Sequence, residues 1–275
     1  MGLLRAAAQA LAADSVDGKL AGIDALGCLV ETGENHADNG VLSAPTGNID
    51  GQTIVRGVPP KPVRVEPHAL AARSNLTTIA GRAALIHAVT HIEYSAIDLA
   101  LDHAVRYTGM PARYYEDWIR VAGEEARHFL LLRTHLHSMG HDYGDFPAHD
   151  GLWEMAEKTA HDCLTRMALV PRLLEARGLD ATPPIQKKLA AAGDHEAVRI
   201  LGVILADEED HVAVGDAWYR FLCRQQDLEP EATFRRLIRE YKAPWPQGPL
   251  NVKARLAAGF AQRELDSLTL GAGER

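Results

Sequence analysis

The sequence predicts an all-α protein organised around four long helices. Ala-rich and Leu-rich segments dominate the 275 residues, and aromatic residues make up only 6%. This composition favours helices over strands. Gly and Pro residues separate long segments that are compatible with helices, as expected at helix ends. Two of these segments also carry the same short polar motif, Glu-x-x-His.

The Gly and Pro residues divide the central part of the chain into two pairs of long helices. We expect the first, second and fourth of these helices at about 77–107, 112–139 and 195–225. The third begins between Leu152 and Asp162 and reaches about residue 192. The loop-like segment 141–151, with Gly144, Pro147 and Gly151, is long enough to cross the length of a bundle. In the third helix, Pro171 predicts a bend, and Gly178–Pro184 predicts an interruption.

Shorter elements flank this central part, and we divide the chain into 1–72, 73–226 and 227–275. Residues 3–13 and the segment after Asp17 favour short helices. The stretch from 32 to 67 is rich in Gly, Asn, Asp, Thr and Pro, which predicts a loop and extended linker. A linker this long is functional, wraps the domain or is mobile. Accessory helices are expected at 230–241 and 250–268.

The two Glu-x-x-His motifs predict a metal site. Positions three apart lie on one face of a helix, so each motif can direct a carboxylate and an imidazole to one point. A further Glu precedes Glu125 by 32 residues and Glu208 by 33, a nearly equal spacing. In an antiparallel pair of helices this spacing brings the upstream Glu level with the motif. The six candidate ligands are Glu93, Glu125, His128, Glu175, Glu208 and His211.

The pattern of apolar neighbours favours this interpretation over solvated charges. Glu125 shares a helix face with Trp118, Val121 and Leu132, and burying a carboxylate there is costly unless it is paired or bound to a metal. Trp118 and Trp218 are the aromatic residues whose helical phase could face the metals.

Other acidic and histidine residues fit the site less well. Glu154 and Glu157 lie 54 and 51 residues before Glu208, too far for the same helix pairing. His87 and His91 are four residues apart, but His91 and Glu93 point about 200° apart around a helix. We therefore expect these two histidines to have a structural role in the core or on the surface, and not to bind the metal.

This pattern resembles the ferritin-like di-iron carboxylate superfamily over about residues 73–226. There, two helices each supply a Glu and two supply Glu-x-x-His. The strings 81–87, 145–151 and 166–172 are similar to a bacterial ferritin-like family known as domain of unknown function 455, which resembles the di-iron tRNA hydroxylases in plan. The resemblance implies a four-helix bundle with a long crossover between its second and third helices.

Four carboxylates and two imidazoles suit two divalent ions, and such ligands favour iron or manganese over zinc. The expected cofactor is two iron ions, or an iron–manganese pair. The resemblance implies an O₂-dependent hydroxylase or oxidase with an electron donor and an unknown small or macromolecular substrate. Two alternatives stay open: an iron-handling ferroxidase or rubrerythrin-like peroxide scavenger, and a helical scaffold stabilised by metal.

The net charge, the length of the apolar runs and the cysteine content limit which partners and which cell compartment are expected. The net charge of −8 argues against a general nucleic-acid binder. No apolar run reaches the roughly 18 residues of a membrane span, and no signal peptide is evident. The three cysteines are far apart, which fits a reducing compartment. We expect a cytoplasmic protein without membrane contact, and a homodimer is left open.

Overall fold

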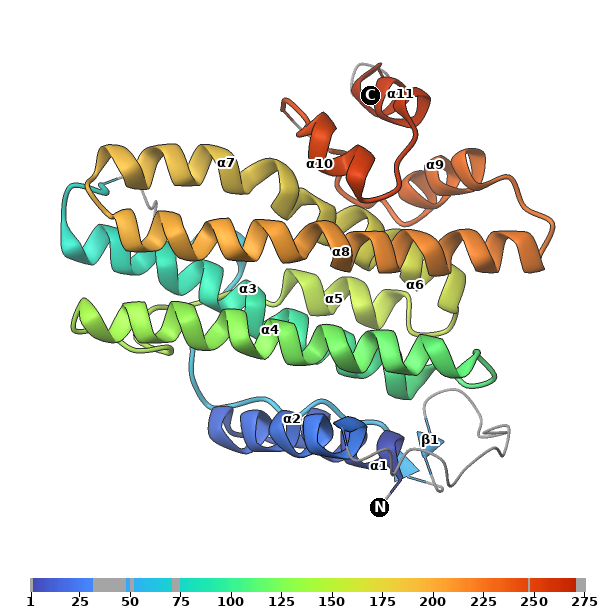
Figure 1. Cartoon of the computed structure of the whole chain (residues 1–275), viewed down its shortest axis with the longest axis horizontal. Coiled ribbons are helices and arrows are strands. Elements are labelled where there is room, and N and C mark those ends of the chain that lie inside the picture. The colour runs from blue at the N-terminus through green and yellow to red at the C-terminus, as the bar shows by residue number, and fades with distance from the viewer. Residues whose placement is uncertain (1, 32–47, 50–51, 71–74, 247, 271–275) are drawn as a thin grey trace. The chain divides into compact units, whose positions relative to one another are not determined.

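The computed structural model describes residues 2–31, 48–49, 52–70, 75–246 and 248–270. Regular structure in this part of the chain is almost entirely helical (Figure 1), so the prediction of an all-α protein is confirmed. Two short strands, β1 (Asn48–Ile49) and β2 (Gln52–Thr53), pair antiparallel. The chain forms two compact units, Met1–Trp153 and Glu154–Arg275. The division at residues 72 and 226 stays a prediction.

The first unit is built on a pair of long antiparallel helices. Its elements are α1 (Leu3–Ala12), α2 (Val16–Glu31), the 3₁₀ turn η2 (Pro67–Ala69), α3 (Ile79–Arg106) and α4 (Ala112–Ser138). The side chain of Thr78 caps α3 by accepting a hydrogen bond from the Gly81 amide at 3.1 Å. Gly109 and Gly140, both with positive φ, follow the ends of α3 and α4. These helices match the first two predicted from the sequence.

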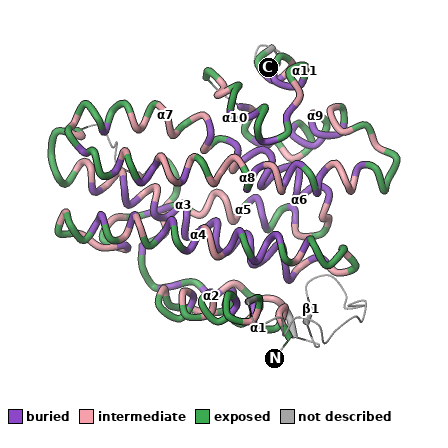
Figure 2. Tube along the Cα trace, viewed as in Figure 1, coloured by how far each residue is buried: buried purple, intermediate pink, exposed green. Residues whose placement is uncertain are grey.

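Helix α3 is the centre of the first unit. Every residue from Glu93 to Val105 is buried, which covers all faces of the helix over more than three turns (Figure 2). Helix α4 packs along one side of α3, and α1 packs on another. Buried polar residues on α3 must therefore find partners within the protein.

Part of the predicted linker wraps the first unit as an extended strap, residues 54–66. The Gly57 amide donates to the carbonyl oxygen of Leu11 at 2.9 Å, and a side chain at Gly57 would collide with the end of α1. Farther on, Val65 and Ala148 are joined by a hydrogen bond of 2.8 Å from the Val65 amide. The strap therefore joins the N-terminal helices to the crossover segment 141–151. Residues 32–47 of the linker lie outside the described residues.

The second unit contains the other two long helical segments and the C-terminal helices. After α5 (Gly151–Lys158), which spans the boundary, its elements are α6 (Cys163–Leu169), the π-helix η3 (Val170–Glu175), α7 (Ala176–Ala191), α8 (His195–Gln225), α9 (Pro230–Glu240), α10 (Val252–Ala257) and α11 (Gln262–Leu270). Helix α8 has the predicted bounds. Around Pro171 the helix is a π-helix, in which each turn contains more residues than a turn of an α-helix.

Two sequence predictions in the second unit are wrong. Helix α7 runs without interruption through Gly178, Pro183 and Pro184. Because Pro183 has no amide hydrogen, the Leu179 carbonyl loses its helical partner, and the Asn251 side-chain amide donates to it instead at 3.1 Å. The predicted helix 250–268 is two helices, which are separated at Gly259 where φ is +95°.

None of the helices in the described residues is long and apolar enough to cross a membrane. Cys28, Cys163 and Cys223, all within the described residues, are not joined by disulfide bonds.

Candidate metal centre

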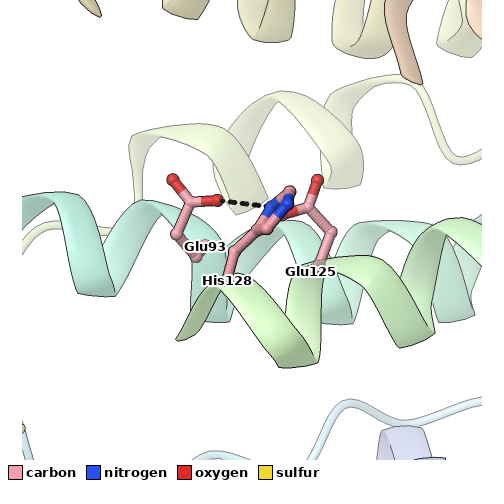
Figure 3. A group of neighbouring side chains, drawn as sticks. All are labelled: Glu93, Glu125 and His128. Carbon is pink, nitrogen blue, oxygen red and sulfur yellow. Dashed lines mark hydrogen bonds and ion pairs between the residues drawn. The ribbon is translucent and has the colours of Figure 1, made fainter. Parts of the chain in front are cut away.

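Glu93, Glu125 and His128 come together in the interior of the first unit. Glu93 projects from α3, and Glu125 and His128 project from one face of α4 (Figure 3). Their exposed fractions are 3%, 2% and 0%. The helix pairing predicted from the sequence therefore brings Glu93 level with the first Glu-x-x-His motif.

The geometry of this cluster suits a metal ion. The Nδ1 atom of His128 lies 3.3 Å from Glu93 Oε2 and 3.3 Å from Glu125 Oε2. One ligand atom from each residue lies within 4.8 Å of the other two. First-row metals bind such atoms at about 2.0–2.2 Å, so donors around one ion stand roughly 3 Å apart. Small side-chain adjustments would satisfy that spacing.

The two carboxylates of the cluster are buried close together, so a positive charge beside them is strongly favoured. Burial raises the pKa of Glu93 to about 7, and the nearby Glu125 carboxylate adds to this effect against the attraction of His128. Burial lowers the pKa of His128, but the hydrogen bonds and charges of Glu125 and Glu93 outweigh it and raise the pKa to about 11. In the protein without metal, an imidazolium thus sits between two carboxylates. A divalent cation in place of its proton neutralises both carboxylates.

The second Glu-x-x-His motif lies on α8 in the second unit. His211 is fully buried, and Glu208 is partly buried. One ligand atom of Glu208 and one of His211 lie within 4.8 Å of each other. The motif therefore presents a carboxylate and an imidazole from one helix face, as its spacing predicts.

Glu175 is the last residue of the π-helix η3 and is partly buried. Within the described residues of the second unit, it does not complete a group of three with Glu208 and His211 at that spacing. Its rivals Glu154 and Glu157 are exposed on α5. The assignment of Glu175 as the ligand from the third long helix stays a prediction.

His87 and His91 hold the crossover segment rather than joining Glu93. The Gly144 amide donates to His87 Nε2 at 2.9 Å. His91 Nε2 lies 3.2 Å from the His149 carbonyl oxygen and Nδ1 lies 2.8 Å from the Tyr143 hydroxyl, which fixes a neutral ring that donates to the carbonyl and accepts from Tyr143. Burial and the nearby Arg64 lower the pKa of His91 to about 3.

Trp118 and Trp218, the two tryptophans that the sequence analysis places near the candidate ligands, are both buried. The ring centre of Trp118 lies 4.3 Å from that of His103, and the ring centre of Trp218 lies 5.4 Å from that of Phe221.

A buried ionic network around α3 was not among the features predicted from the sequence. Asp98 is fully buried and forms ion pairs with Lys19 at 2.5 Å and with Arg56 at 2.7 Å. Arg56 and Arg64 also bind Asp150 of the crossover, at 3.3 and 3.2 Å. The sequence does contain one indication of this network. Asp98 lies within the apolar run 96–101, and a buried acid there needs a cationic partner.

Comparisons with known proteins give a family without an assigned activity. A family model described as "Protein of unknown function (DUF455)" matches residues 16–266. A protein of Haemophilus influenzae described as "Uncharacterized protein" is 47% identical over 222 residues, which cover 78% of this chain and 77% of that protein. No solved structure matches the chain.

Proposed function

The chain belongs to the family described as protein of unknown function DUF455, and we propose that it is a dinuclear metal protein, an O₂-dependent hydroxylase or oxidase of ferritin-like plan. One observation carries the proposal: two buried carboxylates and a buried imidazole converge from α3 and α4. Buried acids of this kind are costly unless a cation is bound. The ion-paired imidazolium supplies one positive charge to two carboxylates.

The proposed ligand set combines this cluster with the corresponding residues of the second half. In addition to Glu93, Glu125 and His128, Glu208 and His211 supply a second carboxylate–imidazole pair, and Glu175 supplies the fourth carboxylate. Four carboxylates balance the charge of two divalent ions, and oxygen-rich ligands favour iron or manganese. When bound, such a pair of ions supplies one-electron and O₂ chemistry, which side chains alone do not provide.

The residues of the chain have defined roles in this proposal. The carboxylates and the imidazoles hold the ions, and the proton on His128 is displaced when a cation binds. The buried position of Glu93, Glu125 and His128 excludes bulk water from the ligands. Trp118 and Trp218 are proposed to line an apolar pocket beside the ions. The substrate and the electron donor are external to the chain.

Rapid mixing of the anaerobic iron-loaded protein with O₂ tests the proposed reaction class. We expect absorbance changes faster than the oxidation of free ferrous iron, and recovery of the starting spectrum after reduction. Counting iron per chain in the same samples separates this outcome from iron storage, for which many ions per chain are expected. Oxidation no faster than that of free ferrous iron would defeat the enzymatic proposal.

A further inference from the structure

We propose that the segment from Asn251 to the end of α11, which includes α10, forms a splint that sets the position of Glu175. Arg172 and Arg255 are its positioning residues. The consequence for metal binding rests on the proposed function, in which Glu175 is a ligand. The splint itself rests on contacts within the second unit on both sides of Glu175.

On the N-terminal side, Arg172 ties the π-helix η3 to α8 and α11. Arg172 is fully buried, and its Nε donates to Asp216 Oδ1 at 2.6 Å. Its Nη2 donates to Glu264 Oε1 on α11. Arg220 closes the ring by binding the other oxygens of Asp216 and Glu264, each at 2.7 Å. Two arginines and two acids therefore form a network without net charge, in which Arg220 alone is partly exposed.

Aromatic rings fix the orientation of the same guanidinium group. The Arg172 Cζ atom lies 4.1 Å from the ring centre of Phe234, 4.4 Å from that of Phe260 and 5.1 Å from that of Tyr219. Cation–π contacts strengthen when they are shielded from water, as here. Phe234 and Phe260 belong to the C-terminal segment, so that segment surrounds a residue of the π-helix.

The π-helix is also seated closely against α8. A Cβ atom at Gly215 would lie 2.5 Å from the Pro171 Cβ atom, so only glycine allows this approach. Pro171 and Arg172 are thus held by two separate contacts. Because Glu175 ends the same π-helix, its Cα position follows from these contacts.

On the C-terminal side, Asn251 and Arg255 bind the first turns of α7. The Asn251 side chain donates to the Leu179 carbonyl, which lacks a helical donor because of Pro183. Arg255 Nη2 donates to the Ala176 carbonyl at 3.2 Å and to Asp180 Oδ2 at 2.6 Å. The splint therefore binds the chain three residues before Glu175 and again immediately after it.

Two conservative variants test the splint without removing its core. Asn251→Ser keeps an oxygen that can cap α10 but cannot reach the Leu179 carbonyl. Glu264→Gln removes the charge that Arg172 and Arg220 share. The matched control is Glu231→Gln, which removes an exposed ion pair between α9 and Arg263 in the same segment. Each variant is examined by amide hydrogen exchange and by Mn²⁺ binding followed by electron paramagnetic resonance.

We expect faster exchange at amides 172–182 in Asn251→Ser and Glu264→Gln, with α3 unchanged and with Glu231→Gln like the wild type. Loss of such supporting contacts weakens metal binding about 10- to 100-fold, so one Mn²⁺ should bind correspondingly less tightly. Unchanged exchange at 172–182 overturns the splint. Faster exchange with unchanged Mn²⁺ affinity overturns its role in positioning Glu175. Wild-type protein that binds no Mn²⁺ defeats the proposed function, and hydrogen exchange alone then decides whether the splint exists.

Discussion

At the scale of single residues, the proton on His128 and the proposed metal compete for the same place. Both carboxylates beside His128 raise its pKa, and burial raises the pKa of Glu93. At neutral pH the site therefore holds protons that a cation must displace. A group with a raised pKa in the folded protein keeps its proton to higher pH than it would in water.

Metal affinity should consequently rise with pH. Between about pH 6 and about pH 8, we expect the Mn²⁺ affinity to increase by roughly tenfold per pH unit for each proton displaced. Titration of the protein with Mn²⁺ at several pH values, with proton release followed by an indicator dye, measures this slope. An affinity independent of pH, with no proton release, would contradict the protonated state assigned to the site.

Asp150 gives a second prediction at this scale. Burial raises its pKa, but the charges of Arg56 and Arg64 outweigh burial and hold the pKa below its usual range. The resulting stability is present above the unfolded pKa of about 3.9 and is lost as pH falls through the lower folded value. Because Asp150 is 24% exposed, Asp150→Asn should lower the free energy of unfolding at pH 7 by only about 1 kcal/mol.

Urea unfolding of wild type and Asp150→Asn at neutral and acidic pH checks this prediction. The difference between the two proteins should shrink toward about pH 3. Asp24→Asn, at an exposed position on α2, is the matched control and should leave stability unchanged. A difference that grows with acidity would show that the Arg56–Asp150–Arg64 contacts do not stabilise the folded state.

At the scale of elements, the sequence predicted the helices whose ends have local signals. Thr78 caps α3, and glycines with positive φ end α3 and α4. The relation of Glu93 to Glu125 follows from the same signals, because helix rise and hairpin length fix the level of each residue. These features depend on residues close to each other in the chain, so a sequence pattern reveals them.

The elements that the sequence did not predict depend on distant residues. Helix α7 continues through Pro183 because the Asn251 side chain donates to the Leu179 carbonyl, which the proline leaves without a helical donor. The π-helix η3 depends on Gly215 and on Asp216, more than 40 residues away. Local propensity favours a break at such positions, and only tertiary contacts reverse it.

Gly259 provides the test of this interpretation at the element scale. Its φ of +95° is strained for other residues, and a Cβ atom would lie 2.7 Å from Asp216 Oδ2. Gly193 also has positive φ, at +79°, but no atom within 4 Å of an added Cβ. Gly193→Ala should therefore cost about 1 kcal/mol through the backbone alone, and Gly259→Ala should cost clearly more, about 2–3 kcal/mol.

Chemical denaturation of the two variants measures the difference directly. Equal losses for Gly259→Ala and Gly193→Ala would show that Asp216 moves freely to make room. A larger loss for Gly259→Ala is expected, because the carboxylate of Asp216 is fixed by both Arg172 and Arg220.

At the scale of the whole molecule, the chain carries a Glu followed by Glu-x-x-His twice, once in each compact unit. The first unit gathers its three candidate ligands in its interior, and the second presents Glu208 and His211 from one helix face. Glu175 is the last residue of a π-helix, whose irregular turn a spacing argument based on regular α-helices does not include. The assignment of Glu175 as a ligand therefore stays a prediction.

Metal removal should affect the stability of the whole chain. A ligand that binds only the folded state stabilises it by about 2.7 kcal/mol at a hundredfold excess over its dissociation constant. Chelation should thus lower the melting temperature of metal-loaded wild type by several degrees, or roughly 2–4 °C per kcal/mol for a protein of this size. Calorimetry with and without chelator measures the shift. No shift in a protein shown to contain stoichiometric metal would contradict a buried site.

The most direct test of the dinuclear proposal is the number of ferrous ions bound per chain under anaerobic conditions. The decisive variant is His128→Ala combined with His211→Ala. The matched control replaces the exposed His137 on α4 and the exposed His195 on α8 with Ala. We expect two ions per chain in the wild type and in the control, as the proposed ligand set requires, and no stoichiometric binding in the decisive variant. Iron binding that is the same in all three proteins, or absent from the wild type, would contradict the proposed metal centre.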